Sequence, residues 1–313
     1  LGVAIALLAF LNITQQFTFL LIGLLMVSLL SASQDIATDA LAIGLLSPAE
    51  RGFGNGIQRG GNSLGAIIGG GGMLLLLSYW GWRTTLLAMA AVLLLAAVPI
   101  ARHREQTVKP TTLSSASFRR LIGIYRRPGM GRWLIVLMLY GIGPYMALTM
   151  FRPLLVDLGL SMGEIGLLLG VVSYGAGLLG AVVAGLNITR LGRKRALISF
   201  STLQVIAIAA YCLPALGFTA LPMLYLAATV AQFINGMAMT ALFTVMMDKS
   251  DATTAGTDYT VQSSVVYISG ILGATFSGII AEAIGYGGVF TVALGFVAIT
   301  VLAISYLFHQ GLS

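Results

Sequence analysis

Three ionisable side chains near the start of the chain lie inside otherwise apolar stretches: Asp35, Asp39 and Arg59. Asp35 and Asp39 are four residues apart, a spacing that places both carboxyls on one face of a helix. Ionisable groups are costly at membrane depth, so each is a functional candidate by default. A carboxyl in such a place can bind a proton, pair with a cation or hydrogen-bond a polar solute.

Asp39 and Arg59 are expected at similar depth on neighbouring helices. Each lies ten residues from a turn centred near Ala49, which at a rise of ~1.5 Å per residue is ~15 Å along either helix. We therefore predict an Asp39–Arg59 ion pair, acting either as a gate or as a structural clamp. Asp35 lies about one turn deeper without a basic match. It suits proton coupling or a bond to substrate, unless neighbouring Ser and Asn side chains satisfy it.

Further polar side chains interrupt the apolar stretches, and interhelical hydrogen bonding is the alternative explanation for each. Tyr145 follows Gly143 and Pro144, which weaken a helix midway, as in helices that line transport sites. Arg152 either faces a cavity that attracts anions or extends to the membrane interface. With the carboxyls and Arg59, the candidate substrate and coupling residues also include Gln34, Asn55, Gln58, Asn62, Tyr174, Gln232, Asn235 and Gln262.

The composition is that of a membrane protein. Of the 313 residues, 9% are charged and 58% hydrophobic, and the mean hydropathy is +0.96; soluble domains carry about 25% charged residues. Apolar runs long enough to cross a bilayer predict an all-α protein. We predict ten spans, at residues 1–13, 17–44, 53–79, 82–101, 131–155, 162–188, 195–213, 219–246, 258–284 and 287–309.

The basic residues occupy alternate loops. Of the 17 Lys and Arg residues, all except Arg59, Arg83 and Arg152 fall in the loops after the second, fourth, sixth and eighth spans. This bias marks those loops as cytoplasmic and explains the net charge of +7 without a nucleic-acid partner. The longest polar connection predicts an N-terminal bundle at 1–101, a cytoplasmic linker at 102–130 and a C-terminal bundle at 131–313.

An internal repeat of 204 residues pairs Gly52 with Gly256, Gln58 with Gln262 and Gly69 with Gly273. Two parallel six-helix repeats are the organisation of major facilitator permeases. If the third span matches the ninth, two helices are missing before residue 1, and ten of twelve are present. We expect a major facilitator fold with two pseudo-symmetric bundles.

Residues 31–40 (SASQDIATDA) and 46–52 (LSPAERG) resemble the AmpG-like branch of the major facilitator superfamily, which includes muropeptide permeases and siderophore permeases of the rhizobactin and pyochelin type. Residues 54–58 and 152–157 are more similar to the siderophore subgroup. Residues 185–194 (GLNITRLGRK) are similar to the superfamily's loop motif, with Thr189 where an acidic residue is expected. We expect this copy to lack the motif's charge-pair gate.

The resemblance implies a proton-driven importer in a bacterial inner membrane that works by alternating access, and we expect its cargo to be a siderophore. An anhydro-muropeptide permease is the alternative, followed by a drug or metabolite exporter and by a non-transporting scaffold or sensor. We expect a monomer with no cofactor and no metal site. The sequence holds no nucleophile–base pair, metal-ligand set or phosphate-binding loop, so we do not expect an enzyme.

Overall fold

The computed structural model describes residues 1–12, 15–102, 127–251 and 254–309, and its regular elements there are all helical. Most of the predicted linker, residues 103–126, lies outside the described chain. The elements are α1 (Gly2–Leu8), α2 (Phe17–Leu45), α3 (Arg51–Ala66), the π-helical η1 (Ile67–Gly72), α4 (Met73–Arg102), α6 (Met130–Asp157), α7 (Met162–Ile165), the π-helical η3 (Gly166–Ser173), α8 (Tyr174–Leu191), α9 (Arg193–Ala215), α10 (Leu221–Asp248) and α11 (Ala255–His309).

Seven of the described helices are long and apolar enough to cross a membrane. This confirms an all-α membrane protein, whereas ten spans out of twelve stay a prediction. The span expected at 1–13 is helical only from Gly2 to Leu8, and the one expected at 53–79, which runs through α3 and η1, is not among the seven. The last two expected spans form the single element α11.

Two glycines bend long helices in the same way. Gly81 in α4 has φ 73° and ψ 177°, and Gly285 in α11 has φ 71° and ψ 178°. Backbone of this kind is essentially restricted to glycine, because a side chain there is strained. The two positions are 204 residues apart, the offset of the sequence repeat, so the bend extends that repeat to backbone geometry.

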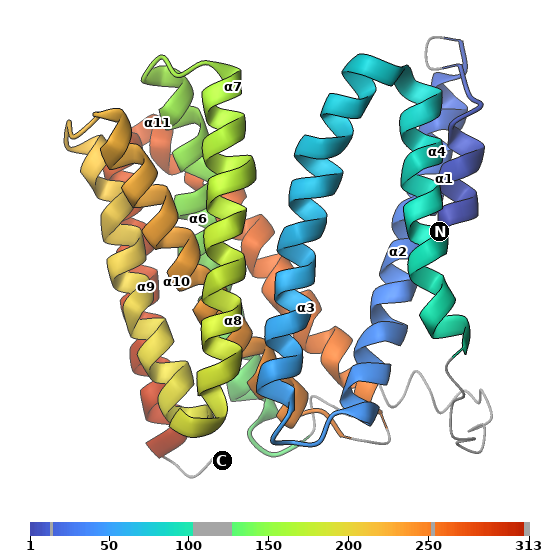
Figure 1. Cartoon of the computed structure of the whole chain (residues 1–313). Coiled ribbons are helices and arrows are strands. Elements are labelled where there is room, and N and C mark those ends of the chain that lie inside the picture. Colours follow the sequence, from blue (N-terminus) through green and yellow to red (C-terminus); the bar gives the residue numbers. More distant parts are fainter. Residues whose placement is uncertain (13–14, 103–126, 252–253, 310–313) are drawn as a thin grey trace.

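Helices α6 to α11 pack together on one side of the molecule, and α1, α2 and α4 lie on the other (Figure 1). Between them, α3 packs against α8 and α10, while α2 contacts α11. Burial differs between the two sides. In the most apolar stretch of α10, 67% of the residues are buried inside the protein, whereas in that of α2 only 6% are. The packed core therefore lies in the second half of the chain.

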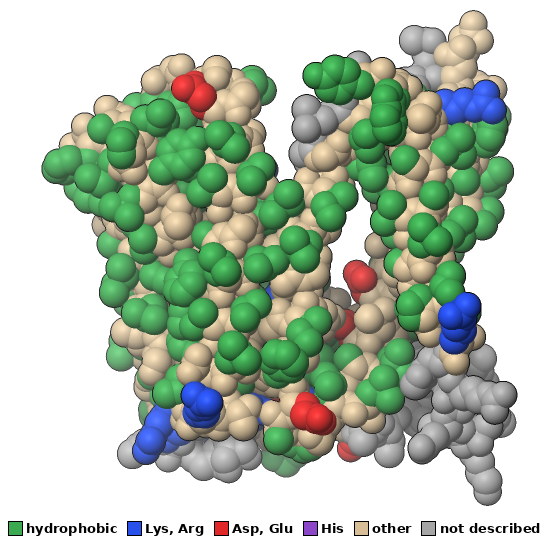
Figure 2. Space-filling view, in the orientation of Figure 1, with side chains coloured by type: hydrophobic (Ala, Val, Ile, Leu, Met, Phe, Trp, Pro, Cys, Tyr) green, Lys and Arg blue, Asp and Glu red, His purple; other side chains and the backbone are tan. Residues whose placement is uncertain are grey.

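One end of the bundle is here called the basic end, because it carries Arg51, Arg127, Arg190, Arg193 and Lys249. Figure 2 shows Lys and Arg side chains mainly at the lower end, with apolar side chains covering most of the height. Near this end α3 crosses α8, where a Cβ on Gly56 would lie 3.2 Å from the Cα of Gly185. Small residues allow such close helix approach in membranes.

Toward the opposite end, α3 and α8 separate (Figure 1), and a Cβ on Gly61, Gly65 or Gly69 would meet open space within the described chain. The two sides of the molecule are therefore joined near the basic end and apart at the other.

Candidate functional site

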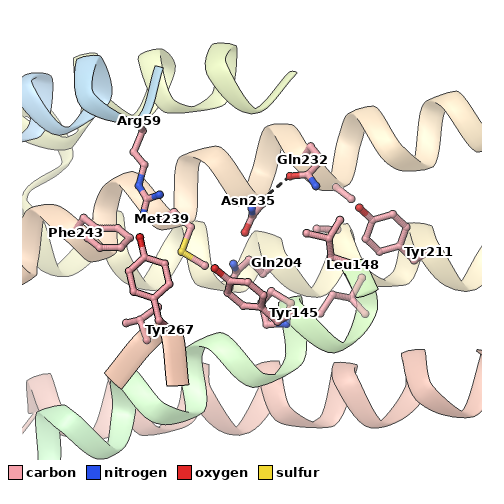
Figure 3. A pocket seen from close by; sticks show the side chains of 15 residues that line it. Arg59, Tyr145, Leu148, Gln204, Tyr211, Gln232, Asn235, Met239, Phe243 and Tyr267 are labelled. Atoms are coloured by element: carbon pink, nitrogen blue, oxygen red, sulfur yellow. Dashed lines mark hydrogen bonds between the residues drawn. The ribbon is translucent and has the colours of Figure 1, made fainter. Parts of the chain in front are cut away.

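A cavity opens among α3, α6, α9, α10 and α11 (Figure 3), with about 720 Å³ of empty space including the part open to solvent. Most of its wall comes from the second half of the chain. The residues that line it are Arg59, Pro144, Tyr145, Leu148, Gln204, Ala207, Ile208, Tyr211, Ala231, Gln232, Asn235, Met239, Phe243, Val266 and Tyr267. Four of them, Arg59, Tyr145, Gln232 and Asn235, are predicted site residues that the fold brings together.

Arg59 is the one lining residue that the described first half contributes. Its guanidinium carbon lies 3.7 Å from the centre of the Phe243 ring on α10. A cation over an aromatic face is attracted by the negative face of the ring. This contact holds the positive charge at the wall of the cavity, and a guanidinium suits a carboxylate or phosphate.

Amide side chains line the middle of the cavity. Asn235 donates from Nδ2 to Oε1 of Gln232 at 3.4 Å, the dashed line in Figure 3. Among the described residues, four buried side-chain atoms have no hydrogen-bond partner, and two belong to this wall: Oδ1 of Asn235 and Nε2 of Gln204. Leaving a buried polar group unpaired costs about 1–3 kcal/mol. Both atoms are free to hydrogen-bond a solute in the cavity.

Sequence reasoning missed Gln204, which is only 3% exposed. The signal that could have found it is a polar amide alone near the middle of the apolar run 195–213. Tyr211, Tyr267 and Phe243 were likewise absent from the predicted set, because aromatic residues are common in membrane helices and their positions alone do not indicate a cavity.

The predicted Asp39–Arg59 ion pair is wrong, since it is not among the ion pairs of the described chain. Asp39 is buried and instead accepts a hydrogen bond from Nε2 of Gln58 at 2.7 Å. Equal depth on two helices does not fix the direction in which each side chain points, and Arg59 turns toward Phe243. Asp35, expected to be deep and unmatched, is exposed in this structure, as is Gln34.

The other predicted residues lie away from the cavity. Asn55 is buried and donates to the backbone oxygen of Arg51 and the sulfur of Met247. Gln262 is buried near the basic end, where it accepts from Nε1 of Trp133 at 2.7 Å and donates to Ser250 at 3.1 Å. Both have the interhelical role offered as the alternative. The side chains that the fold leaves exposed are Asn62, Arg152 and Tyr174.

An ion-pair cluster joins the two sides of the molecule at the basic end. The carboxylate of Asp248 accepts from Arg51 at 3.0 Å and from Arg193 at 2.7 Å. Arg193 also donates to the backbone oxygen of Pro48, and Thr189 donates to that of Ala49 at 3.1 Å. The expected loss of the charge pair is therefore wrong: Asp248 on α10 supplies the acid that position 189 lacks.

The turn that presents these backbone oxygens is held by Glu50. Its carboxylate accepts from the hydroxyl of Ser47 at 2.6 Å and from the backbone N–H of Ser47 at 3.0 Å. These two hydrogen bonds lower the pKa of Glu50 below its ordinary value, because they stabilise the charged form.

The arrangement as a whole is that of a membrane-embedded binding cavity. The two sides of the molecule meet at one end through ion pairs and diverge at the other, and the polar groups of the cavity lie between the two ends. Such a geometry allows binding of a polar solute and exposure of it to one side at a time.

Comparisons with known proteins agree with this description. The family model described as Major Facilitator Superfamily matches residues 1–274 and, again, residues 157–311. The anhydromuropeptide permease of Escherichia coli strain K12 is 28% identical over 289 residues, which cover 91% of this chain and 59% of that protein. The anhydromuropeptide permease of E. coli O157:H7 has the same identity and coverage. The chain thus spans about three fifths of the length of these relatives.

Three solved structures share the fold. The human organic anion transporter MFSD10 has a TM-score of 0.76 at 17% identity, covering 97% of this chain and 75% of that one. The E. coli fucose:proton symporter FucP has a TM-score of 0.73 at 17% identity (98% and 82%). A bacterial homologue of the iron transporter ferroportin, in an outward-facing state, has 0.64 at 16% (94% and 73%).

The expected siderophore subgroup finds no support in these comparisons, since both curated relatives described above are anhydromuropeptide permeases. The family itself rests on the match that extends over most of the chain. The helical architecture, with its repeated bend, agrees with that match. This chain belongs to the Major Facilitator Superfamily, a family of multi-pass membrane transporters.

Proposed function

We propose that the protein is a secondary permease that imports an anhydromuropeptide across a bacterial inner membrane by alternating access. The 28% identity to anhydromuropeptide permeases supports this cargo over a siderophore. Proton coupling and a monomeric state are part of the proposal. In it, the bundles 1–101 and 131–313 rock against each other around the cavity.

The chemistry of the cavity carries the proposal. The cavity is partly open to solvent and is lined by both apolar and polar side chains, as small-molecule sites usually are. Its wall offers amides from Gln204, Gln232 and Asn235, tyrosine side chains and the guanidinium of Arg59. A sugar–peptide cargo presents the complementary groups: hydroxyls, amides and a carboxylate.

The roles of the candidate residues follow from their places. Arg59, Tyr145, Gln232 and Asn235 contact the cargo, and Asp35 and Asp39 carry the coupling proton. Asn55, Gln58 and Gln262 hold neighbouring helices together at the basic end. Exposed in this structure, Gln34, Asn62, Arg152 and Tyr174 are candidate contacts in the states in which the two halves have closed over the cargo.

Uptake into energised cells that express the full gene product tests the proposal. Labelled anhydromuropeptide and an iron-55 siderophore are supplied side by side, with and without a protonophore. Accumulation of anhydromuropeptide that the protonophore abolishes is the expected result. Accumulation of iron alone would replace the cargo with a siderophore, and accumulation of neither would favour an exporter.

A further inference from the structure

Gln204 is a buried amide side chain in the apolar helix α9. It lies on α9 in line with Ala207, Ile208 and Tyr211, a spacing of three, four and seven residues that puts all four side chains on one helix face. That face lines the cavity. Gln204 is 3% exposed, and its Nε2 has no partner in the described chain.

Asn235 supplies the opposite hydrogen-bonding group from the facing helix. Its Nδ2 is engaged by Gln232 at 3.4 Å, which orients the amide and leaves Oδ1 buried without a partner. Both side chains line the same cavity, and in Figure 3 they lie between Arg59 at one end and Tyr211 at the other. The cavity thus holds one unpaired donor and one unpaired acceptor in its middle.

We infer that Gln204 and Asn235 form a recognition site for a secondary amide of the cargo. Nε2–H of Gln204 donates to the amide carbonyl, and Oδ1 of Asn235 accepts from the amide N–H. A carboxylate only accepts and an ammonium only donates, so each would leave one of the two atoms unpaired. This inference rests on the proposed function, because it names the group of the cargo, the N-acetyl amide, that the cavity selects.

A site of this kind is expected to distinguish a cargo that carries the amide from one that lacks it, rather than to bind every cargo more tightly. A site built to hydrogen-bond a group rejects an analogue without that group, because its own buried polar atoms then stay unpaired. Arg59, at the end of the cavity, attracts an anionic cargo whether or not it carries an amide. The two effects are separable: Gln204 acts on the choice between acetylated and deacetylated cargo, and Arg59 acts on both.

The test compares the wild type with Gln204→Leu, which keeps the volume and removes the amide. Uptake of anhydromuropeptide and of its N-deacetylated analogue is measured for both proteins. We expect Gln204→Leu to raise KM about tenfold or more for the acetylated cargo and to leave KM for the deacetylated one unchanged. Equal KM values for the acetylated cargo in the two proteins would overturn the inference.

A stability measurement separates this role from a structural one. Because Gln204→Leu removes an unpaired buried atom, the purified variant should melt at the same temperature as the wild type or higher. A clearly lower melting temperature would indicate that Gln204 has an internal partner, against the inference. Thr202→Val is the matched control, since Thr202 is exposed on α9 and bonds only the backbone of its own helix at Ile198.

Binding of N-acetylglucosamine, with glucosamine as the comparison, keeps this test independent of the cargo. We expect N-acetylglucosamine to raise the melting temperature of the wild type and not of Gln204→Leu. Binding of N-acetylglucosamine by a protein that does not take up anhydromuropeptide would retain the amide site and reject the proposed cargo. Uptake of anhydromuropeptide without a preference for N-acetylglucosamine over glucosamine would retain the cargo and reject the amide site. Neither uptake nor binding would reject both.

Discussion

The guanidinium of Arg59 lies over the ring of Phe243. In the 204-residue repeat, Phe243 occupies the position that corresponds to Asp39. In the first half this position is an acid that Gln58 binds, and in the second half it is a ring that holds a cation from the first half. Within the described chain the guanidinium of Arg59 makes this ring contact and donates no hydrogen bond, so its N–H groups stay available to a ligand.

Arg59→Lys keeps the charge but loses the planar donors, so we expect about a tenfold higher KM for an anionic cargo with the protein still folded. Uptake kinetics measure the effect. Arg83→Lys is the matched control. The guanidinium carbon of Arg83 lies 4.5 Å from the centre of the Phe10 ring, and neither residue lines the cavity. Similar KM values in Arg59→Lys and the wild type would remove Arg59 from the binding site.

Asp248→Asn should favour the state that is open at the basic end, since it weakens both ion pairs of the carboxylate. Partly exposed pairs contribute about 0.2–1 kcal/mol each, so the population should shift severalfold. Ile188, buried near the α3–α8 contact, reports on this opening: a cysteine there, in a Cys212→Ala background, should react faster with a maleimide. Asp157→Asn, at the opposite end, should leave the reaction rate unchanged.

Substitution of the two acidic residues on α2 tests coupling. We expect Asp35→Asn to abolish proton-driven accumulation at a normal level of protein in the membrane. Asp39→Asn should do the same while keeping exchange of cargo, because an asparagine can still accept the hydrogen bond from Gln58. Accumulation and counterflow in vesicles measure the two activities. Normal accumulation by both variants would mean that neither carboxyl carries the coupling proton.

The Glu50 turn predicts a pH dependence of the contact at the basic end. The pKa of Glu50 is lowered from 4.5 in the folded protein, so its contribution is present above that value and is lost as the pH falls through the folded pKa. Acidification should therefore loosen the turn, and Glu50→Gln should loosen it at neutral pH. An environment-sensitive fluorophore, attached beforehand to a cysteine at position 188 in a Cys212→Ala background, checks this, because its emission does not require a thiolate. Emission that does not change with pH in the labelled protein that keeps Glu50 contradicts the prediction.

Gly285→Ala should destabilise the protein by about 1–3 kcal/mol, because alanine at φ 71° and ψ 178° is strained. Gly81→Ala should behave alike. The control is Gly278→Ala, at a helical position where a Cβ meets open space. Thermal unfolding of the purified variants should show a lower midpoint for the first two and little change for the third. Equal midpoints would mean that the bends relax without strain.

Much of the helical architecture could be predicted from the sequence, because long apolar runs leave few alternatives to a helix. The span expected at 17–44 is the helix Phe17–Leu45, and that expected at 219–246 is Leu221–Asp248. Length and hydropathy do not carry the same information for α3 (Arg51–Ala66), because its polar residues interrupt the apolar pattern of the span expected at 53–79.

The site was predicted in part, and the failures have a common cause. Tyr145, Gln232 and Asn235 were found because polar groups in apolar helices are costly. The partners of Arg59 and Arg193 were not found, because each contact joins distant helices, and a helix rotation unknown from sequence decides whether an acid or a ring is in reach. Gln204 needed the cavity itself to be recognised.

The bends at Gly81 and Gly285 also bear on how the two halves have diverged. Other corresponding positions of the repeat carry different side chains, as Asp39 and Phe243 do, whereas a residue with a Cβ at either bend is strained. Backbone strain therefore opposes substitution of glycine at two corresponding positions of the repeat. These two glycines align the two halves of the chain even where the side chains at corresponding positions differ.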